Sequence, residues 1–521
     1  MITSSKGRRR RAIGLAAASL AVAGLLAACS SGGGSSAAGA SSSGDPVHGG
    51  NLVIDGYADI PTLNKDEVSV SNEAIRVAES IYGRLYVLSS QAKPVPSLAT
   101  GYTLSSNKLT WTFHLRTDAK FSNGAPVTAN DVKFSLELAK AGPYLGSLYQ
   151  DISSILVPNA HTVVIKTSET IPTLLDTLTL YTSGIIPDNY DGESAAKFWA
   201  APISSGAWEV SSYKLGVGCT VVPNKYYYGP KPYLDSVTYK PVPDANTRVL
   251  QLLNGQAQLI ETPPYADLPS LRSGSTQVLE FPSTESDFLI FNTTKAPLNN
   301  VHLRQAISLA INRASIVTAA LSGAGSPIGT WMSPDLMDGY EPAGADEYNL
   351  SAAKKQMAES SVPDGTKLTL LYNGSSSPAW STAAEIVQQD LQAIGIDLSI
   401  QSADSNVVGA ATENKTFDMT MGLLTYDVPD PGELVGYYFA SNEYSSYLAA
   451  GNVKSLWETA NTLFDGSKRL AVYKEVDNAL AANADNPALY TVPWIYGASS
   501  DLHGMSVLST GQFDFSKLWL S

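Results

Sequence analysis

The stretch from Trp111 to Phe134, WTFHLRTDAKFSNGAPVTANDVKF, contains the signals for a strand, a turn and a helix start in succession. Apolar and polar residues alternate over residues 111–115, and this alternation predicts a half-buried strand. Ser-Asn-Gly at residues 122–124 is typical of a turn. Thr128 and Asp131 have the spacing of a capping box before an apolar-periodic segment, so we expect a helix to begin at this point.

Longer patterns further along the chain indicate a mixed α/β body. Residues 302–321 carry apolar side chains at helical spacing and predict one helix. A strand at 368–372, a helix and, after a glycine stop, a strand at 396–400 form the pattern of a βαβ unit, which requires some parallel sheet. A helical region is expected over residues 453–482, followed by a single strand over 490–496.

The N-terminus has the pattern of a lipoprotein export signal. Arginines at residues 8–11 precede an uncharged apolar stretch that ends in Leu26-Ala27-Ala28-Cys29. We expect residues 1–28 to be a signal peptide, Cys29 to carry a lipid anchor, and residues 29–48 to be a flexible Ser/Gly/Ala linker. An ordinary signal peptide and a single anchor helix are the alternatives, although the apolar stretch is too short to span a bilayer comfortably. The Sec and twin-arginine export routes both stay open.

Composition excludes several classes of partner. Removal of residues 1–28 takes five of the 34 basic residues and none of the 48 acidic ones, which leaves 29 against 48 and a net charge of −19. Nucleic acid is therefore a poor partner for the body. The remaining length predicts two or three domains. Apart from Cys29 the chain has only Cys219, so no disulfide is available within a lipidated chain.

Enzyme signatures are few. The chain lacks the Gly-x-Ser-x-Gly elbow, His-Glu-x-x-His and the phosphate-binding Gly-x-x-x-x-Gly-Lys motif. Ser-x-x-Lys occurs five times, but the Lys-Thr-Gly and Ser-Asp-Asn motifs that accompany it in β-lactamases and penicillin-binding proteins are missing. The five histidines are isolated in sequence, so neither a metal site nor a cofactor is indicated. We expect a binding protein and not an enzyme.

Residues 111–134 resemble the signature segment of the family 5 extracellular solute-binding proteins, the peptide- and nickel-type receptors of ATP-driven importers. Other stretches resemble further motifs of this family in the expected order: Pro96–Ala99, Pro202–Trp208, Asn224–Asp235, Leu253–Gln256, Phe291–Thr293 and Pro297–Arg313. The resemblance extends from Gly49 to the C-terminus.

This resemblance implies an α/β chain with a two-lobed, periplasmic-binding-protein-like fold of type II, a hinge and an extra domain. By analogy, the first lobe is discontinuous and the extra domain interrupts it. The implied ranges are 49–90, 200–289 and 490–521 for the first lobe, 91–199 for the extra domain and 290–489 for the second lobe.

The resemblance also implies a ligand site. Asp427 resembles the position that holds the ligand's α-ammonium in peptide-binding members, where it precedes an acidic-Pro pair such as Asp430-Pro431. The alternative is that Asp427 only caps a turn. Leu424 and Ser405 stand where oligopeptide binders place tryptophans. Candidate aromatic residues at the cleft are Tyr426, Tyr144, Trp494 and Tyr496, with Trp331 and Trp380 as weaker additions.

The expected function is that of a substrate-binding lipoprotein of an ATP-binding-cassette importer. It would capture an oligopeptide or similar small solute between its lobes and deliver it to a membrane permease, as a monomer anchored at the extracytoplasmic face of the cell membrane. Three alternatives are weighed against it: a metal-complex or sugar receptor of the same fold, an exported serine hydrolase, and a signalling or adhesive lipoprotein that has lost transport.

Overall fold

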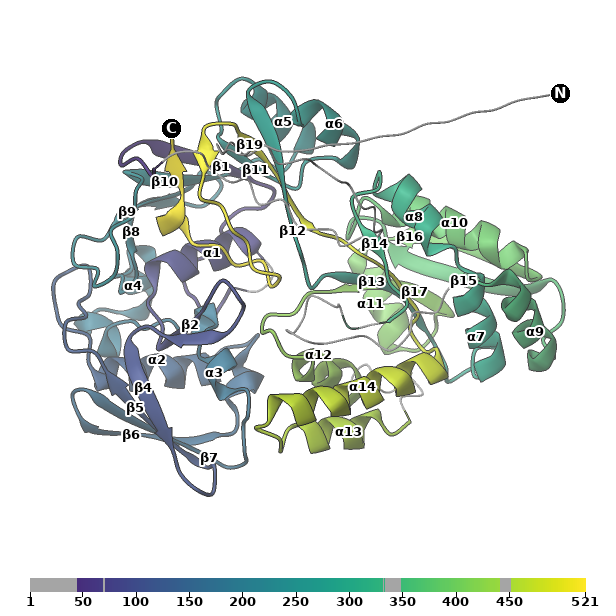
Figure 1. Cartoon of the computed structure of the whole chain (residues 1–521), viewed down its shortest axis with the longest axis horizontal. Helices are drawn as coiled ribbons and strands as arrows, with labels where there is room; N and C mark the ends of the chain where they lie inside the picture. Colours follow the sequence, from purple (N-terminus) through teal and green to yellow (C-terminus); the bar gives the residue numbers. More distant parts are fainter. Residues whose placement is uncertain (1–44, 69–70, 331, 333–347, 441–450) are drawn as a thin grey trace, which may run out of the picture. The chain divides into compact units, whose positions relative to one another are not determined.

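The computed structural model describes residues 45–68, 71–330, 332, 348–440 and 451–521 (Figure 1). The expected signal peptide, Cys29, most of the linker and Trp331 lie outside these ranges. Within the described residues, no helix combines the length and the apolar character needed to cross a lipid bilayer.

The segment 110–141 forms the strand and helix that its sequence predicts. β5 (Thr110–Leu115) buries Trp111, Phe113 and Leu115 and leaves the alternate side chains half-buried or exposed. It lies in a four-stranded antiparallel sheet of order β4-β5-β7-β6, which we call the sheet of the extra domain. The other strands are β4 (Ala99–Leu104), β6 (Ile152–Asn159) and β7 (Thr162–Thr167).

Helix α2 (Ala129–Ala141) begins at the predicted capping residue. The Thr128 backbone N–H donates to Asp131 Oδ2 at 2.6 Å, and the Thr128 hydroxyl donates to the same oxygen at 2.7 Å. Asp131 Oδ1 accepts a third bond, 2.7 Å long, from the backbone N–H of Asp188. One carboxylate therefore fixes the start of α2 and also holds a loop 57 residues away.

A seven-stranded sheet of order β12-β19-β11-β1-β10-β9-β8 is the centre of the first lobe. β1 pairs in parallel with β10 and β11, and β19 pairs antiparallel with β11 and β12. The strands are β1 (Asn51–Gly56), β8 (Trp208–Lys214), β9 (Gly218–Pro223), β10 (Ser236–Pro241), β11 (Leu259–Glu261), β12 (Thr276–Phe281) and β19 (Trp494–Ser499). Its helices are α1 (Asn72–Ile81), α5 (Ala245–Leu253) and α6 (Leu268–Leu271).

A six-stranded sheet of order β14-β18-β13-β17-β15-β16 is the centre of the second lobe. β15 and β16 are parallel over eight residue pairs and are joined through α10 (Trp380–Gln392), which confirms the predicted βαβ unit. The strands are β13 (Ser286–Phe291), β14 (Ser326–Pro327), β15 (Thr366–Asn373), β16 (Ile396–Ala403), β17 (Met419–Leu424) and β18 (Ala488–Thr491).

The single helix predicted over 302–321 is wrong, because the structure has two. α7 (Val301–Ala310) and α8 (Arg313–Ala320) are separated at Asn312. The Asn312 N–H donates to Asp390 at 2.8 Å, and its side-chain oxygen accepts the Ser315 N–H at 3.1 Å, so it caps a new helix.

The helical region predicted over 453–482 is also divided. α13 (Val453–Ala460) ends before Asp465, which accepts the backbone N–H of Lys468 and begins α14 (Gly466–Asn483). The remaining helices of eight residues or more in the second lobe are α9 (Leu350–Ser360) and α11 (Ser405–Glu413).

The single strand predicted over 490–496 is wrong in an informative way. Residues 488–491 form β18 in the second lobe, and residues 494–499 form β19 in the first, where the yellow strand runs beside β12 (Figure 1). Pro493 between them has no N–H to donate to a ladder. The chain thus passes between the two sheets at residues 282–285 and again at 492–493, and these two crossovers are the only links that the described strand order requires.

Replacement of Asp131 by alanine is expected to lower the stability of the protein, because three donors lose their acceptor. The expected cost is about 1–3 kcal/mol, measured by denaturant or thermal unfolding. Asp118→Ala is the control, since this carboxylate is 63% exposed beside Arg116. A melting temperature of Asp131→Ala no lower than that of the control would contradict the assigned role.

Candidate functional site

The Asp427 loop follows β17 and precedes the short helix α12 (Gly432–Val435). Glu433, in the first turn of α12, accepts the backbone N–H groups of Asp427 and Val428 on one oxygen, both at 3.1 Å. The loop is held from its other side by Asp430, whose two oxygens accept from Arg469 at 2.7 and 2.8 Å. These two carboxylates therefore hold the backbone of the loop and so fix the position of Asp427.

Asp427 differs from Asp430 in its charge balance. Asp430 has a buried bidentate arginine partner, whereas the described residues provide no recorded ion pair for Asp427 or for Glu433. Burial raises the pKa of Asp427, and the hydrogen bond with Glu433 offsets part of that rise. Burial and the Asp427 charge together raise the pKa of Glu433 well above its ordinary value. Among the residues that the structure describes, this pair of carboxyls therefore has no ion pair with a cation.

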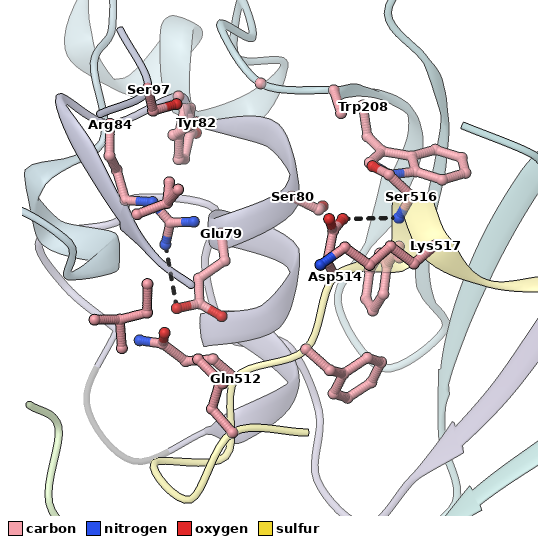
Figure 2. Close-up of a pocket in the computed structure, with 18 of the residues that line it drawn as sticks. Glu79, Ser80, Tyr82, Arg84, Ser97, Trp208, Gln512, Asp514, Ser516 and Lys517 are labelled. Carbon is pink, nitrogen blue, oxygen red and sulfur yellow. Dashed lines mark hydrogen bonds and ion pairs between the residues drawn. The ribbon is translucent and has the colours of Figure 1, made fainter. Parts of the chain in front are cut away.

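A third carboxyl, that of Glu79 on α1, faces the same region from the first lobe. Burial raises its pKa; Arg84 and Arg76 oppose the rise, and the charge of Asp427 adds to it. Glu79 accepts from Arg84 at 3.2 Å, as Figure 2 shows. Glu79 of the first lobe is therefore close enough to Asp427 of the second lobe for the two charges to interact.

Glu79 also lines a pocket of about 220 Å³ (Figure 2). The pocket is bounded by the end of α1, residues 206–208, the Tyr227–Tyr228 pair and the C-terminal segment 506–517. Gly206 is required here, because a Cβ at this position would collide with the carbonyl oxygen of Ser80. Close approach of this loop to α1 closes one side of the pocket.

Aromatic and hydroxyl groups form the pocket wall. The Tyr227 and Tyr228 rings are 4.6 Å apart, and the Tyr228 hydroxyl is 2.8 Å from Ser97 Oγ. On the opposite side, Trp208 Nε1 donates to Ser516 Oγ at 3.2 Å. The wall can therefore pack a side chain and hydrogen-bond a polar group.

The residues predicted from sequence lie in different environments. Tyr426 is fully buried beside Asp427, its backbone N–H donates to Thr284 at 3.1 Å, and its hydroxyl has no partner among the described residues. The Tyr496 hydroxyl accepts from Arg76 at 2.9 Å in the interior of the first lobe. Trp494 is half-buried and donates to the Ser509 carbonyl at 3.0 Å, whereas Tyr144 is 54% exposed.

Sequence analysis missed Glu79, Arg84, Glu433 and the Tyr227–Tyr228 pair. Glu433 could have been found, because an acid in the first turn after Asp430-Pro431 is positioned to accept loop N–H groups. Glu79 and the pocket could not, since their neighbours come from segments more than 100 residues apart.

Across the described ranges, no three His, Cys, Asp or Glu side chains come together in a way that could hold a metal ion.

Comparison with known proteins defines the class. The structure resembles NikA from Brucella suis in complex with Fe(III)-EDTA, with a TM-score of 0.81, 22% identity and coverage of 91% of this chain and 100% of that one. It also resembles the ABC transporter-associated periplasmic binding protein DppA from Helicobacter pylori in complex with the peptide STSA, with a TM-score of 0.76, 22% identity and coverage of 91% and 98%. Two lobes joined by two crossovers, with an added domain, are the type II solute-binding fold.

The family follows from the sequence comparisons. The model of the bacterial extracellular solute-binding proteins, family 5 (middle), matches residues 93–446. The probable D,D-dipeptide-binding periplasmic protein DdpA of Escherichia coli K12 is 29% identical over 451 residues, which cover 83% of this chain and 87% of that protein. The chain belongs to the family 5 extracellular solute-binding proteins.

The raised pKa values predict a pH dependence of stability. A carboxyl whose pKa is raised in the fold binds its proton more tightly when folded than when unfolded. Its favourable contribution is present at low pH and is lost as the pH rises from the ordinary carboxyl range through the folded pKa. Glu433→Gln keeps an acceptor for the two loop N–H groups and removes the charge. Between pH 5 and pH 8 the wild type loses this contribution as the carboxyl pair ionises, so the melting temperature of Glu433→Gln is expected to fall less than that of the wild type over this range.

Differential scanning fluorimetry measures this slope. Glu413→Gln, at the exposed end of α11, is the matched control and is expected to keep the wild-type slope. Identical slopes of melting temperature against pH for Glu433→Gln and the wild type would contradict raised pKa values in the Asp427–Glu433 pair.

Proposed function

We propose that this protein is the receptor of an ABC importer and captures a peptide or peptide-like solute whose free ammonium group pairs with Asp427. One observation carries the proposal: Asp427 is half-buried beside Glu433 and close enough to Glu79 for its charge to act there, yet it has no cationic partner among the described residues, whereas nearby Asp430 is paired with Arg469. Bringing a carboxylate out of water without a partner is costly, and a ligand ammonium removes that cost.

The pocket beside Glu79 supports the same reading. It has room for an amino-acid side chain, and its wall combines two tyrosine rings in tilted contact with hydroxyl groups. A ligand whose ammonium lies at Asp427 would place its first side chain near this pocket, because Glu79 borders both. The peptide STSA in the complex with DppA of H. pylori and the D,D-dipeptide in the name of DdpA are of this chemical class.

Closure of the lobes completes the function. A solute that contacts Asp427 in the second lobe and the pocket in the first favours the closed form through its differential affinity. The closed form would be the one that a membrane permease recognises. The protein would act as a monomer without performing chemistry, held at the extracytoplasmic face of the membrane by a lipid on Cys29.

The identity of the solute is tested by native mass spectrometry of the purified protein and by calorimetry with free-amine peptides. A bound peptide or amine in the spectrum, or a peptide that raises the melting temperature, is the expected result. Failure of all peptides together with stabilisation by a metal chelate or a sugar would replace this proposal by another receptor of the same fold. Labelling by a serine-directed activity probe would indicate a hydrolase.

Asp427→Asn is expected to weaken peptide binding by more than about tenfold, because the ligand ammonium loses its buried partner. The melting temperature of the ligand-free variant should stay close to that of the wild type. Asp430→Asn provides the contrast: it breaks the buried pair with Arg469 and should lower stability by about 3–5 kcal/mol. An N-acetylated peptide, which has no ammonium, should bind wild type and Asp427→Asn equally weakly. Equal affinity of both proteins for the free-amine peptide would remove Asp427 from the site.

A further inference from the structure

A second pair of acidic residues lies where the first crossover enters the second lobe. Glu285 ends the crossover at residues 282–285, and Asp287 is the second residue of β13. Because they are two positions apart in extended chain, their side chains are on one face of the sheet. Tyr490 of β18 is the register partner of Asp287, so its ring lies on that face as well.

Asp287 is fully buried and only partly satisfied. Its Oδ1 accepts the indole N–H of Trp380 at 3.0 Å, whereas its Oδ2 has no hydrogen-bond partner among the described residues. The Tyr490 hydroxyl is also fully buried and lies close enough to Asp287 to lower the pKa of its carboxyl against the effect of burial. An unpaired buried acceptor of this kind is costly to the empty protein.

Glu285 extends the cluster toward the first lobe. Its charge acts on Tyr265 in the turn Tyr265–Asp267 and on Tyr57, which follows β1 and is 36% exposed. Burial raises the pKa of Glu285 to about 8, with the Asp287 charge adding to the rise, and burial raises the pKa of Asp287 to about 7. The described residues show no recorded ion pair to either carboxyl.

The chemistry of this cluster is that of a cation site. Among the described residues, neither carboxyl has an ion pair; Trp380 and Tyr490 lie beside Asp287, and Tyr265 lies near Glu285. Aromatic faces attract ammonium and guanidinium groups. Glu261 shows the structural alternative: it is about as buried as Asp287, but Arg76 neutralises it within the fold.

We infer that Glu285 and Asp287, with Tyr265, Tyr490 and Trp380, form a second subsite that takes a positively charged side chain of the solute, such as that of lysine or arginine. This inference rests on the proposed function, because the first charge of the same solute is assigned to Asp427. The solute would then carry two cationic groups at neutral pH, and the preference for the second of them would reside at the crossover.

The test uses three pairs of tripeptides with free N-termini. The three pairs differ in the position that is varied. At that position one peptide of the pair has lysine and the other its uncharged analogue norleucine, and the remaining two residues are alanine. Isothermal calorimetry on the full mature chain is expected to show at least one lysine peptide that binds more than about tenfold tighter than its norleucine partner, a difference of about 1.4 kcal/mol. Glu285→Gln and Asp287→Asn should each remove this difference and leave norleucine binding within about twofold.

Asp55→Asn is the matched control. Asp55 is fully buried, and both its oxygens are unpartnered among the described residues, but Lys240 and Arg248 are the cations that lower its pKa against the effect of burial. This variant should keep the preference for lysine. Loss of the preference in Asp55→Asn as well would overturn the assignment to Glu285 and Asp287.

A second measurement needs no variant. Binding of a cation at partly protonated carboxyls releases protons, so the lysine peptide should release more protons than the norleucine peptide when calorimetry is repeated in buffers of different ionisation enthalpy. Equal proton release and equal affinities within every pair would overturn the second subsite while the proposed function stands. Absence of binding by any of the six peptides would overturn the proposed function itself.

Discussion

The buried guanidinium of Arg76 holds together the part of the first lobe on which both crossovers depend. It lies on α1, pairs with Glu261 of β11, and donates to the hydroxyls of Tyr239 on β10 and Tyr496 on β19. The last of these contacts joins residues 420 positions apart in sequence. A buried ion pair adds little stability over an apolar contact, but leaving either charge alone is costly, so all four elements must assemble together. These contacts fix β19, so the crossover at residues 492–493 leads into a strand whose position is fixed.

The distribution of buried charge separates scaffold from cleft. Several acids that hold the fold together have a cation within the protein: Glu261 has Arg76, Asp430 has Arg469 and Asp66 has the fully buried Lys65, whereas Asp131 is held by neutral donors. Asp287 is fully buried and Asp427, Glu433 and Glu285 are half-buried, and none of the four has an ion pair among the described residues. In the function proposed above, the cost of keeping these charges from water in the empty protein would be the basis of affinity for a positively charged solute, since a bound cation would offset it.

Local patterns predicted the elements whose causes are local. The alternation over 111–115, the cap at Thr128 and Asp131, and the βαβ unit around α10 appear in the structure as expected. The helix breaks at Asn312 and Asp465 were missed because a capping residue within an apolar-periodic run gives a weaker signal than the run itself. The division at Pro493 was missed because strand propensity does not say which sheet a strand joins. Resemblance located Asp427, and Glu433 six residues further on could have been found from its place after Asp430-Pro431, whereas Glu79 comes near Asp427 only when distant segments meet.

The place of β19 within the first sheet has a consequence for the order in which the protein matures. β12 pairs only with β19, and β11 has β19 as its second neighbour, so both present open edges until residues 494–499 arrive. During synthesis the N-terminus emerges first, so nearly the whole chain must be made before β19 can complete the seven-stranded sheet. Unpaired edges of this kind invite pairing with other chains. Pairing of residues 494–499 therefore both completes the sheet and removes the open edges at which the chain could aggregate.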